Sequence, residues 1–414
     1  MIKIILRFLI ITGVCGFFLL TSQISTAQNL GFYFEKGKKK VTIPFETHNN
    51  LIVIPVILNE KHRLKFILDT GVRNTIFIDK SLTDTLGFEY EREIKLYGTG
   101  DAIPLNAFVT GHVSLSMPGI KSEGISTVVL EKDILQLEHH LGIKIHGLIG
   151  YDIFSRFVVK IDYVHEKIIL CEPLQYKVKS KYDAIDLEII ESKPFANLKL
   201  HLNKNDELIS RLLIDTGASH ALVLDINSNS QINIPEKYIE ASLGRGLAGE
   251  IKGYLARIDG FTFGKERLND VITSFPKETL NGQAIGTGRN GTIGGELLKK
   301  FTVIFNFYDS KMYVKPNRTF RFPFEYNMSG LEFTAEGKKL NQYLINNVRK
   351  DSPAFNAGFK RGDILVALND ISSKKLDLSK IYTKLNLKEG KKINMTVYRD
   401  GKYLSRTFHL KREI

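Results

Sequence analysis

The sequence predicts a mainly β protein made of two copies of one β-rich unit, followed by a smaller mixed α/β domain. Two observations predict the duplication. An apolar stretch runs into Asp-Thr-Gly at Asp69 and again at Asp215, and a Gly-x-Ile-Gly segment occurs at 147–150 and again at 291–294. The two offsets, 146 and 144 positions, are nearly equal. A repeat this long indicates a duplicated lobe and not a solenoid unit.

Each copy is predicted to contain two β-hairpins. The first hairpin carries the Asp-Thr-Gly segment at the end of its second strand, because apolar runs separated by a polar break are typical of paired strands. The second hairpin follows the Gly-x-Ile-Gly segment and a short possible helix. The predicted strand pairs are 50–58 with 64–68 and 157–163 with 167–170 in the first copy, and 195–202 with 211–214 and 301–307 with 311–314 in the second. The basic, polar stretch 175–181 is the expected linker.

The composition is that of a globular protein. The chain has 414 residues, of which 43% are apolar and 25% charged, so disorder and a collagen-like structure are excluded. The length exceeds one typical core and indicates two or three domains. The only cysteines are Cys15 and Cys171, which excludes a disulfide scaffold and any multi-cysteine metal site. The formal charge of +13 raises the question of an acidic partner.

Residues 1–27 are predicted to form a secretory signal peptide. Two basic residues lie within the first seven, 8–20 is an uncharged apolar run, and small residues lead to a cleavage site after Ala27. An uncleaved anchor and a lipoprotein attached through Cys15 are the alternatives. We therefore expect export to the periplasm or cell envelope, or secretion. The mature chain has no second long apolar run, so no transmembrane segment is expected in it.

The paired aspartates favour a specific chemistry. A bare Asp-Thr-Gly is expected by chance about 0.1 times in a chain of this length, so two copies at equivalent repeat positions indicate function. The alternative is that each Asp-Thr-Gly only begins a turn after a buried strand. Two carboxylates within hydrogen-bonding distance share one proton, and one of them then serves as general base while the other donates. This chemistry needs no metal and no cofactor.

The neighbouring residues suit the same site. Gly71 and Gly217 allow each loop to turn tightly and to approach its symmetry mate. Thr70 and Thr216 are expected to hydrogen-bond across the pair and to hold the two loops rigid.

The chain resembles the retropepsin-like aspartic peptidases, with two retroviral-protease-like lobes fused in one chain as in pepsin. The resemblance covers roughly residues 45–316 through the two Asp-Thr-Gly and Gly-x-Ile-Gly segments. It implies a two-lobed β-barrel pseudo-dimer with lobes at 28–178 and 179–320, a monomer because both lobes lie in one chain. It also implies an aspartic endopeptidase that hydrolyses extended polypeptide. Asp69 and Asp215 carry over as the catalytic dyad, and Ser219 as a further residue of the second loop.

The resemblance also implies flaps over the site. Glycine-containing segments that suit hinged hairpins are 97–100, with Tyr97, Gly98 and Gly100, and 243–246, with Gly244 and Gly246. These glycines are also ordinary turn residues.

One residue departs from the family pattern. Arg73 stands in the first loop where a small hydroxyl residue is usual, whereas the second loop has Ser219. If Arg73 points at the dyad, its charge lowers the pKa of the carboxyls; if it faces solvent, it leaves them unchanged.

Residues 325–414 resemble a PDZ domain of the kind attached to bacterial exported proteases. Ser352, a proline and a later glycine frame a short helix, and 377–387 alternates at helical spacing. The resemblance implies that a peptide C-terminus binds by strand addition, its carboxylate held by the backbone amides of the loop Gly330, Leu331, Glu332 and Phe333. The alternative is an inert cap that stabilises the peptidase.

The charge is concentrated in this last domain. Residues 325–414 hold 18 basic and 10 acidic residues, so they carry +8 of the total. This favours anionic peptide ends or an acidic envelope surface over nucleic acid, which we do not expect as a partner of an exported protein. A solvated basic face is the alternative. The competing function for the whole chain is a non-catalytic peptide-binding or scaffold protein of the envelope that uses the cleft and the PDZ groove.

Overall fold

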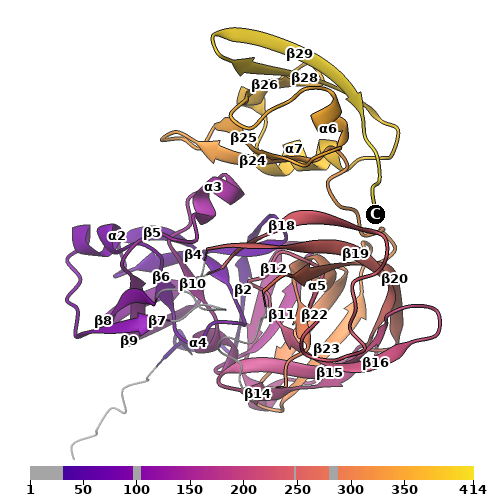
Figure 1. The fold of residues 1–414 in the computed structure, drawn as a ribbon. Helices are drawn as coiled ribbons and strands as arrows, with labels where there is room; N and C mark the ends of the chain where they lie inside the picture. Colours follow the sequence, from indigo (N-terminus) through magenta and orange to yellow (C-terminus); the bar gives the residue numbers. More distant parts are fainter. Residues whose placement is uncertain (1–30, 97–103, 247–248, 279–287) are drawn as a thin grey trace, which may run out of the picture. The chain divides into compact units, whose positions relative to one another are not determined.

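The computed structural model describes residues 31–96, 104–246, 249–278 and 288–414 (Figure 1). The predicted signal peptide at 1–27 lies outside the described residues. Strands dominate the described part of the chain and the helices are short, so the protein is mainly β as predicted. Among the described residues, no helix is both long enough and apolar enough to cross a membrane.

The first copy is built on a sheet of nine strands in the described residues, with the order β1-β9-β6-β10-β5-β4-β8-β7 and with β3 beside β4. Strands β4 and β5 pair antiparallel, with Val53 opposite Ile67, which confirms the predicted hairpin. The elements are β1 (Tyr33–Phe34), β3 (Glu46–His48), β4 (Leu51–Leu58), β5 (His62–Leu68), β6 (Ile76–Phe77), α2 (Lys80–Thr85), β7 (Arg92–Leu96), β8 (Leu105–Met117), β9 (Ile120–Leu130), α3 (Leu137–Leu141), β10 (Gly147–Ile149) and α4 (Tyr151–Phe154).

The second copy repeats this arrangement. Its described strands form a sheet of eight in the order β14-β15-β16-β21-β17-β20-β19-β18. The predicted hairpin is again present, with Phe195 of β15 opposite Leu213 of β16. The elements are β14 (Glu188–Ile190), β15 (Lys193–His201), β16 (Glu207–Ile214), β17 (Leu222–Leu224), β18 (Tyr238–Gly246), β19 (Gly249–Phe263), β20 (Glu266–Pro276), β21 (Gly291–Ile293) and α5 (Gly295–Leu298).

The Gly-x-Ile-Gly segments form short parallel strands beside the strands that end in aspartate. Ile149 of β10 lies opposite Leu68 of β5, and Ile293 of β21 lies opposite Ile214 of β16. A methyl group on Gly150 would lie 1.9 Å from the carbonyl oxygen of Asp69, so only glycine fits there. The repeated segments therefore pack directly against the Asp-Thr-Gly loops.

A third sheet joins the two copies. In the described residues it has six strands in the order β13-β23-β22-β11-β12-β2, and β11 of the first copy pairs antiparallel with β22 of the second (Figure 1). The elements are β2 (Lys40–Pro44), β11 (Val158–Asp162), β12 (Lys167–Cys171), η1 (Pro173–Gln175), β13 (Asp183–Asp186), β22 (Phe301–Asn306) and β23 (Lys311–Pro316). The hairpins β11–β12 and β22–β23 were predicted; their union into one sheet was not.

One apolar core continues through both copies. Phe154, which follows the first Gly-x-Ile-Gly segment, packs edge-on against Phe305 of β22, with ring centroids 5.2 Å apart. Burial of such large side chains contributes about 1.5–3 kcal/mol each. Because the shared sheet and core cross from one copy to the other, the two Asp-Thr-Gly loops are held at fixed positions relative to each other.

The C-terminal domain has its own sheet and its own core. Its elements are β24 (Leu331–Glu336), β25 (Gln342–Val348), α6 (Pro353–Asn356), β26 (Ile364–Leu368), β27 (Ile371–Ser372), η3 (Ser373–Lys375), α7 (Leu378–Leu385), β28 (Lys392–Arg399) and β29 (Lys402–His409). Ser352 caps α6 as predicted, its hydroxyl accepting from the amide of Phe355 at 3.3 Å. Helix α7 is capped by Asp377 and ends at Leu385, two residues before the predicted end at 387.

Candidate active site

The ends of β5 and β16 bring the two aspartates into equivalent loops. The amide of Asp69 donates to the carbonyl of Ile149 at 2.9 Å, and the amide of Asp215 donates to the carbonyl of Ile293, also at 2.9 Å. Each aspartate is therefore attached to the parallel strand of its own copy. The duplicated backbone gives both carboxyl groups the same starting position.

Two threonines tie the loops together. The hydroxyl of Thr70 donates to the carbonyl of Ile214 at 2.7 Å and accepts from the amide of Thr216 at 3.0 Å. The hydroxyl of Thr216 donates to the carbonyl of Leu68 at 2.8 Å and accepts from the amide of Thr70 at 3.1 Å. Both threonines are buried. The cross-loop hydrogen bonds expected from the sequence are therefore formed, and each hydroxyl satisfies one donor and one acceptor of the opposite copy.

The glycines let the carboxyl groups meet. The amide of Gly71 donates to Asp69 Oδ1 at 2.6 Å, and the amide of Gly217 donates to Asp215 Oδ1 at 2.8 Å. A methyl group on Gly217 would lie 2.1 Å from Asp69 Cγ, so any larger residue would displace the opposite carboxyl. A methyl group on Gly71 would lie 3.0 Å from Asp69 Oδ1 and 3.1 Å from Asp215 Oδ2, so the two carboxyls lie side by side, as sharing one proton requires.

The two carboxyls are electrostatically unequal. Burial raises the pKa of Asp69 well above its ordinary value, and the negative charge of Asp215 raises it further. Burial also raises the pKa of Asp215, but the Gly217 amide, the hydrogen bond from Asp69 and the positive charges of Arg289 and Lys193 oppose the rise. Burial therefore keeps a proton on the pair, and the positive charge of Arg289 favours the ionised form of Asp215.

The remaining residues predicted in the loops do not touch the dyad. Arg73 is exposed, and the main charges acting on Asp69 are those of Asp215 and Lys193. Of the two fates considered for Arg73, the structure shows that it faces solvent. Ser219 supports the loop through its backbone carbonyl, which accepts from Asn50 Nδ2 of the first copy at 2.8 Å.

The flap candidates are only partly described. Tyr97, Gly98 and Gly100 lie outside the described residues. Gly244 and Gly246 lie in β18, which pairs with β19 as an antiparallel hairpin and has an irregular register between Ser242 and Gly244. Gly244 has a φ of +122°, a conformation that favours glycine. The second candidate therefore lies in a hairpin strand, as a flap requires.

One charged residue of the site was missed from the sequence. Arg289 precedes β21, and its Nε donates to the carbonyl of Gly291 at 3.1 Å. Its charge acts on Asp215. Arg289 lies 74 positions after Asp215 in the sequence, and only the parallel pairing of β21 with β16 brings the two close.

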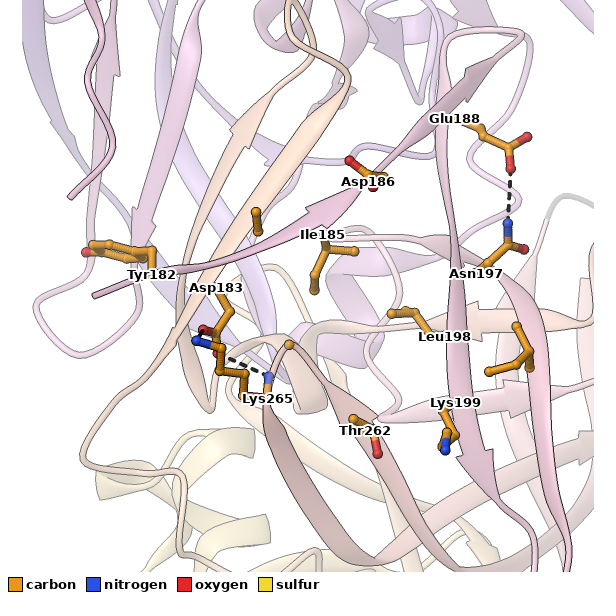
Figure 2. Close-up of a pocket in the computed structure, with 13 residues that line it drawn as sticks. Tyr182, Asp183, Ile185, Asp186, Glu188, Asn197, Leu198, Lys199, Thr262 and Lys265 are labelled. Atoms are coloured by element: carbon orange, nitrogen blue, oxygen red, sulfur yellow. Dashed lines mark hydrogen bonds and ion pairs between the residues drawn. The ribbon is translucent and has the colours of Figure 1, made fainter. Parts of the chain in front are cut away.

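An open hollow of about 640 Å³ lies elsewhere on the second copy (Figure 2). Asp183, Glu188, Asn197, Lys199 and Lys265 line it, and Figure 2 shows two of its internal contacts, Asn197 to Glu188 and Lys265 to Asp183. None of the residues of the dyad loops lines it. Within the described part of the chain, no group of three or more histidine, cysteine or acidic side chains is placed to hold a metal ion.

Of the four residues predicted to form the carboxylate loop, only Gly330 precedes the edge strand β24. Leu331, Glu332 and Phe333 lie in the strand itself, so the prediction of a loop is wrong for these three residues. Within the described residues β24 lies at the edge of its sheet beside β25, the position at which a strand can be added, and its Ala335 carbonyl is also hydrogen-bonded to the ring of His139 at 2.9 Å. Gly330 has a φ of +80°, and a methyl group on it would lie 2.2 Å from the side chain of Ser352. Glu332 lies between two residues whose amides already have partners within the domain. The amide of Leu331 donates to Ser329 Oγ at 3.1 Å, and the amide of Phe333 donates to Tyr382 Oη at 2.9 Å.

Comparisons with known proteins match two parts of the chain. Residues 54–153, which include the first Asp-Thr-Gly loop, match the family model of the aspartyl proteases. Residues 329–410 match the family model of the PDZ domain. The chain therefore carries an aspartyl protease domain and a C-terminal PDZ domain. A search of curated proteins finds no match to this chain.

The threonine pair generates a stability prediction. Thr216→Val removes a hydroxyl and leaves the buried amide of Thr70 and carbonyl of Leu68 without partners. At about 1–3 kcal/mol for each buried unpaired group, the free energy of unfolding of the peptidase part should fall by roughly 2–5 kcal/mol, measured by urea denaturation. Thr216→Ser keeps the hydroxyl and is the control, with an expected loss of about 1 kcal/mol. Equal losses in the two variants would show that the hydrogen bonds are not responsible.

The raised pKa of Asp69 generates a pH prediction. A carboxyl whose pKa is higher in the folded state stabilises the fold at low pH, and this contribution is lost as the pH rises through the folded value. Asn in place of Asp69 avoids that loss. The Tm of Asp69→Asn relative to the wild type should therefore rise between pH 3 and pH 7, measured by differential scanning fluorimetry. A difference that is constant with pH would contradict the raised pKa.

Proposed function

We propose that this protein is an aspartic endopeptidase that hydrolyses extended polypeptide with a water molecule activated between Asp69 and Asp215. The observation that carries the proposal is the close approach of the two carboxyls in equivalent loops: a methyl group on Gly217 would lie 2.1 Å from Asp69 Cγ, and one on Gly71 would lie 3.1 Å from Asp215 Oδ2. The match to the aspartyl protease family model supports it.

The charge distribution of the pair supports a division of labour. The carboxylate of Asp215 accepts a proton from the bound water, and the resulting oxygen nucleophile attacks the carbonyl carbon of the peptide bond. The protonated carboxyl of Asp69 donates to the carbonyl oxygen, which becomes a hydroxyl group of the tetrahedral intermediate. When the C–N bond breaks, Asp215 gives its proton to the departing amine. One hydroxyl group of the intermediate returns a proton to Asp69, which leaves a carboxylic acid product and restores the starting state of the pair. No covalent intermediate with the protein forms.

We further propose that the PDZ domain recruits substrates by their C-termini. The edge strand β24, which begins directly after Gly330, supports this role. The basic charge of this domain, +8 in residues 325–414, favours a peptide that ends in a carboxylate.

The place of action proposed for the protein is the periplasm or the cell envelope, reached through residues 1–27. The pattern of the signal peptide, with cleavage after Ala27, supports this proposal. N-terminal sequencing of protein recovered from the envelope fraction tests it, since a mature chain that begins at Gln28 is the expected result. A chain that begins at Met1 would indicate a retained anchor.

The dyad generates the activity prediction. The purified protein should cleave a denatured protein or a peptide library within pH 3–8, and Asp69→Asn and Asp215→Asn should each lower the rate by at least about 10²–10⁴-fold, because each removes one general acid–base group. Cleavage is measured by mass spectrometry of the products. The control is Asp186→Asn, whose carboxyl is exposed on β13 and pairs only with a surface lysine.

Three outcomes are informative. Loss of cleavage in both dyad variants and not in the control supports the proposal. Cleavage that survives in either dyad variant contradicts the assignment of the dyad. A wild-type protein that retains peptides without cutting them favours the non-catalytic binding protein.

The PDZ groove generates a binding prediction. Tyr382→Phe frees the amide of Phe333, so a peptide that uses this amide no longer has to displace a hydroxyl. A hydrogen bond of about 1 kcal/mol corresponds to an affinity about fivefold higher. The measurement is fluorescence polarisation with a labelled hexapeptide ending in a free valine carboxylate, on the full chain carrying Asp69→Asn so that the peptide is not cut.

Two controls accompany this measurement. The same peptide with an amidated end should bind more weakly to both proteins. Tyr398→Phe changes an exposed tyrosine of β28 in the same domain and should leave the affinity unchanged. An affinity that falls or stays the same in Tyr382→Phe would show that the Phe333 amide is not used by the peptide.

A further inference from the structure

The backbone around the dyad makes equivalent hydrogen bonds to the two aspartates. Each carboxyl accepts from the glycine amide two residues later, and each aspartate amide donates to the parallel strand of its own copy. The cross-loop threonine bonds are reciprocal. The backbone and the threonines therefore do not distinguish Asp69 from Asp215, and the difference between them must come from neighbouring side chains.

Arg289 is the side chain that breaks the symmetry. It is half-buried, and its guanidinium is attached to β21 by two hydrogen bonds, from Nε to the carbonyl of Gly291 at 3.1 Å and from Nη2 to Thr292 Oγ1. The carbonyl of Ile293, the next residue of β21, accepts a hydrogen bond from the amide of Asp215. The cation is therefore held by the same strand that holds Asp215.

The first copy has no such cation. The offset of 144 that relates the two Gly-x-Ile-Gly segments places Ile145 at the position of Arg289. Ile145 is buried in an apolar cluster with Val53 and Ile67. The arginine that the first loop does possess, Arg73, is exposed.

The other charged groups near the pair do not create the same asymmetry. Lys193 acts on both Asp69 and Asp215, so it favours ionisation of the pair without selecting one member. Arg289 also faces Asp225, a buried carboxyl that stabilises its charge. Burial and the charge of Arg289 lower the pKa of His220 to about 3, so this ring is neutral at higher pH.

We propose that Arg289 is a positioning residue that keeps the shared negative charge on Asp215 and the shared proton on Asp69. This inference rests on the proposed function, because it assigns the base to Asp215 and the acid to Asp69. It explains how a duplicated site, with equivalent backbone on both sides, has one base and one acid before substrate binds.

The first experiment needs no activity. In Asp69→Asn the remaining carboxyl is Asp215, and in Asp215→Asn it is Asp69; each is titrated in the full chain by NMR of ¹³C-labelled aspartate. Asp215 alone should titrate at lower pH than Asp69 alone, because a nearby positive charge favours the ionised form. Adding Arg289→Gln keeps hydrogen-bond donors but removes the charge. This change should raise the pH at which Asp215 titrates and leave the pH at which Asp69 titrates nearly unchanged.

Two comparisons keep this experiment decisive. Arg289→Lys retains the charge and should preserve part of the difference in titration pH between Asp215 and Asp69. It therefore separates the effect of charge from that of packing if Arg289→Gln is poorly folded. Arg73→Ser, which copies the residue of the second loop, should leave both titrations unchanged. Equal titration of the two carboxyls with Arg289 present, or a difference that survives its replacement by Gln, would overturn the proposal.

The second experiment uses catalysis. If the wild type cleaves peptide, Arg289→Gln should move the acid limb of kcat/KM to higher pH, because Asp215 then needs a higher pH to ionise, and Arg289→Lys should restore part of the shift. An unchanged acid limb contradicts the role of Arg289. If the wild type does not cleave, the proposed function fails, and the titrations still decide whether Arg289 sets the charge of the pair.

Discussion

The reciprocal hydrogen bonds of Thr70 and Thr216 are the contacts on which the site depends. Each hydroxyl enters the opposite copy and satisfies one backbone amide and one backbone carbonyl there. The pair therefore holds Asp69 and Asp215 at one separation. The shared six-stranded sheet and the continuous core, counted within the described residues, keep the two copies in the register that these bonds require.

Duplication places the two carboxyls of the dyad close together, but it also gives them equivalent surroundings. Two copies of one loop place two carboxyls symmetrically, yet a general acid and a general base must differ in protonation. In this chain the difference between Arg289 and Ile145, at equivalent positions, provides an asymmetric charge next to a symmetric scaffold. Arg73 of the first loop departs from the family pattern, but its side chain is exposed and does not contact the dyad.

Local pattern predicted most of the elements and little of their assembly. The hairpins before the two aspartates, the hairpins after the Gly-x-Ile-Gly segments, the cap of α6 and the helix α7 follow from alternation, turn residues, a capping residue and helical spacing, all of which act within a few positions. The parallel pairing of β10 with β5 and of β21 with β16, and the pairing of β11 with β22, join segments far apart in the chain. No local signal specifies such pairs, so they were not predicted.

The sequence by itself predicted the candidate dyad, because a repeated Asp-Thr-Gly at equal spacing is informative without coordinates. It also determined that Gly71 and Gly217 stand where a close approach is needed. Only the tertiary structure decided which charges surround the carboxyls. Arg73 is four residues from Asp69 and faces solvent, whereas Arg289 is distant in sequence and acts on Asp215. Electrostatic interactions depend on distance in space and on burial, and neither is encoded in sequence separation.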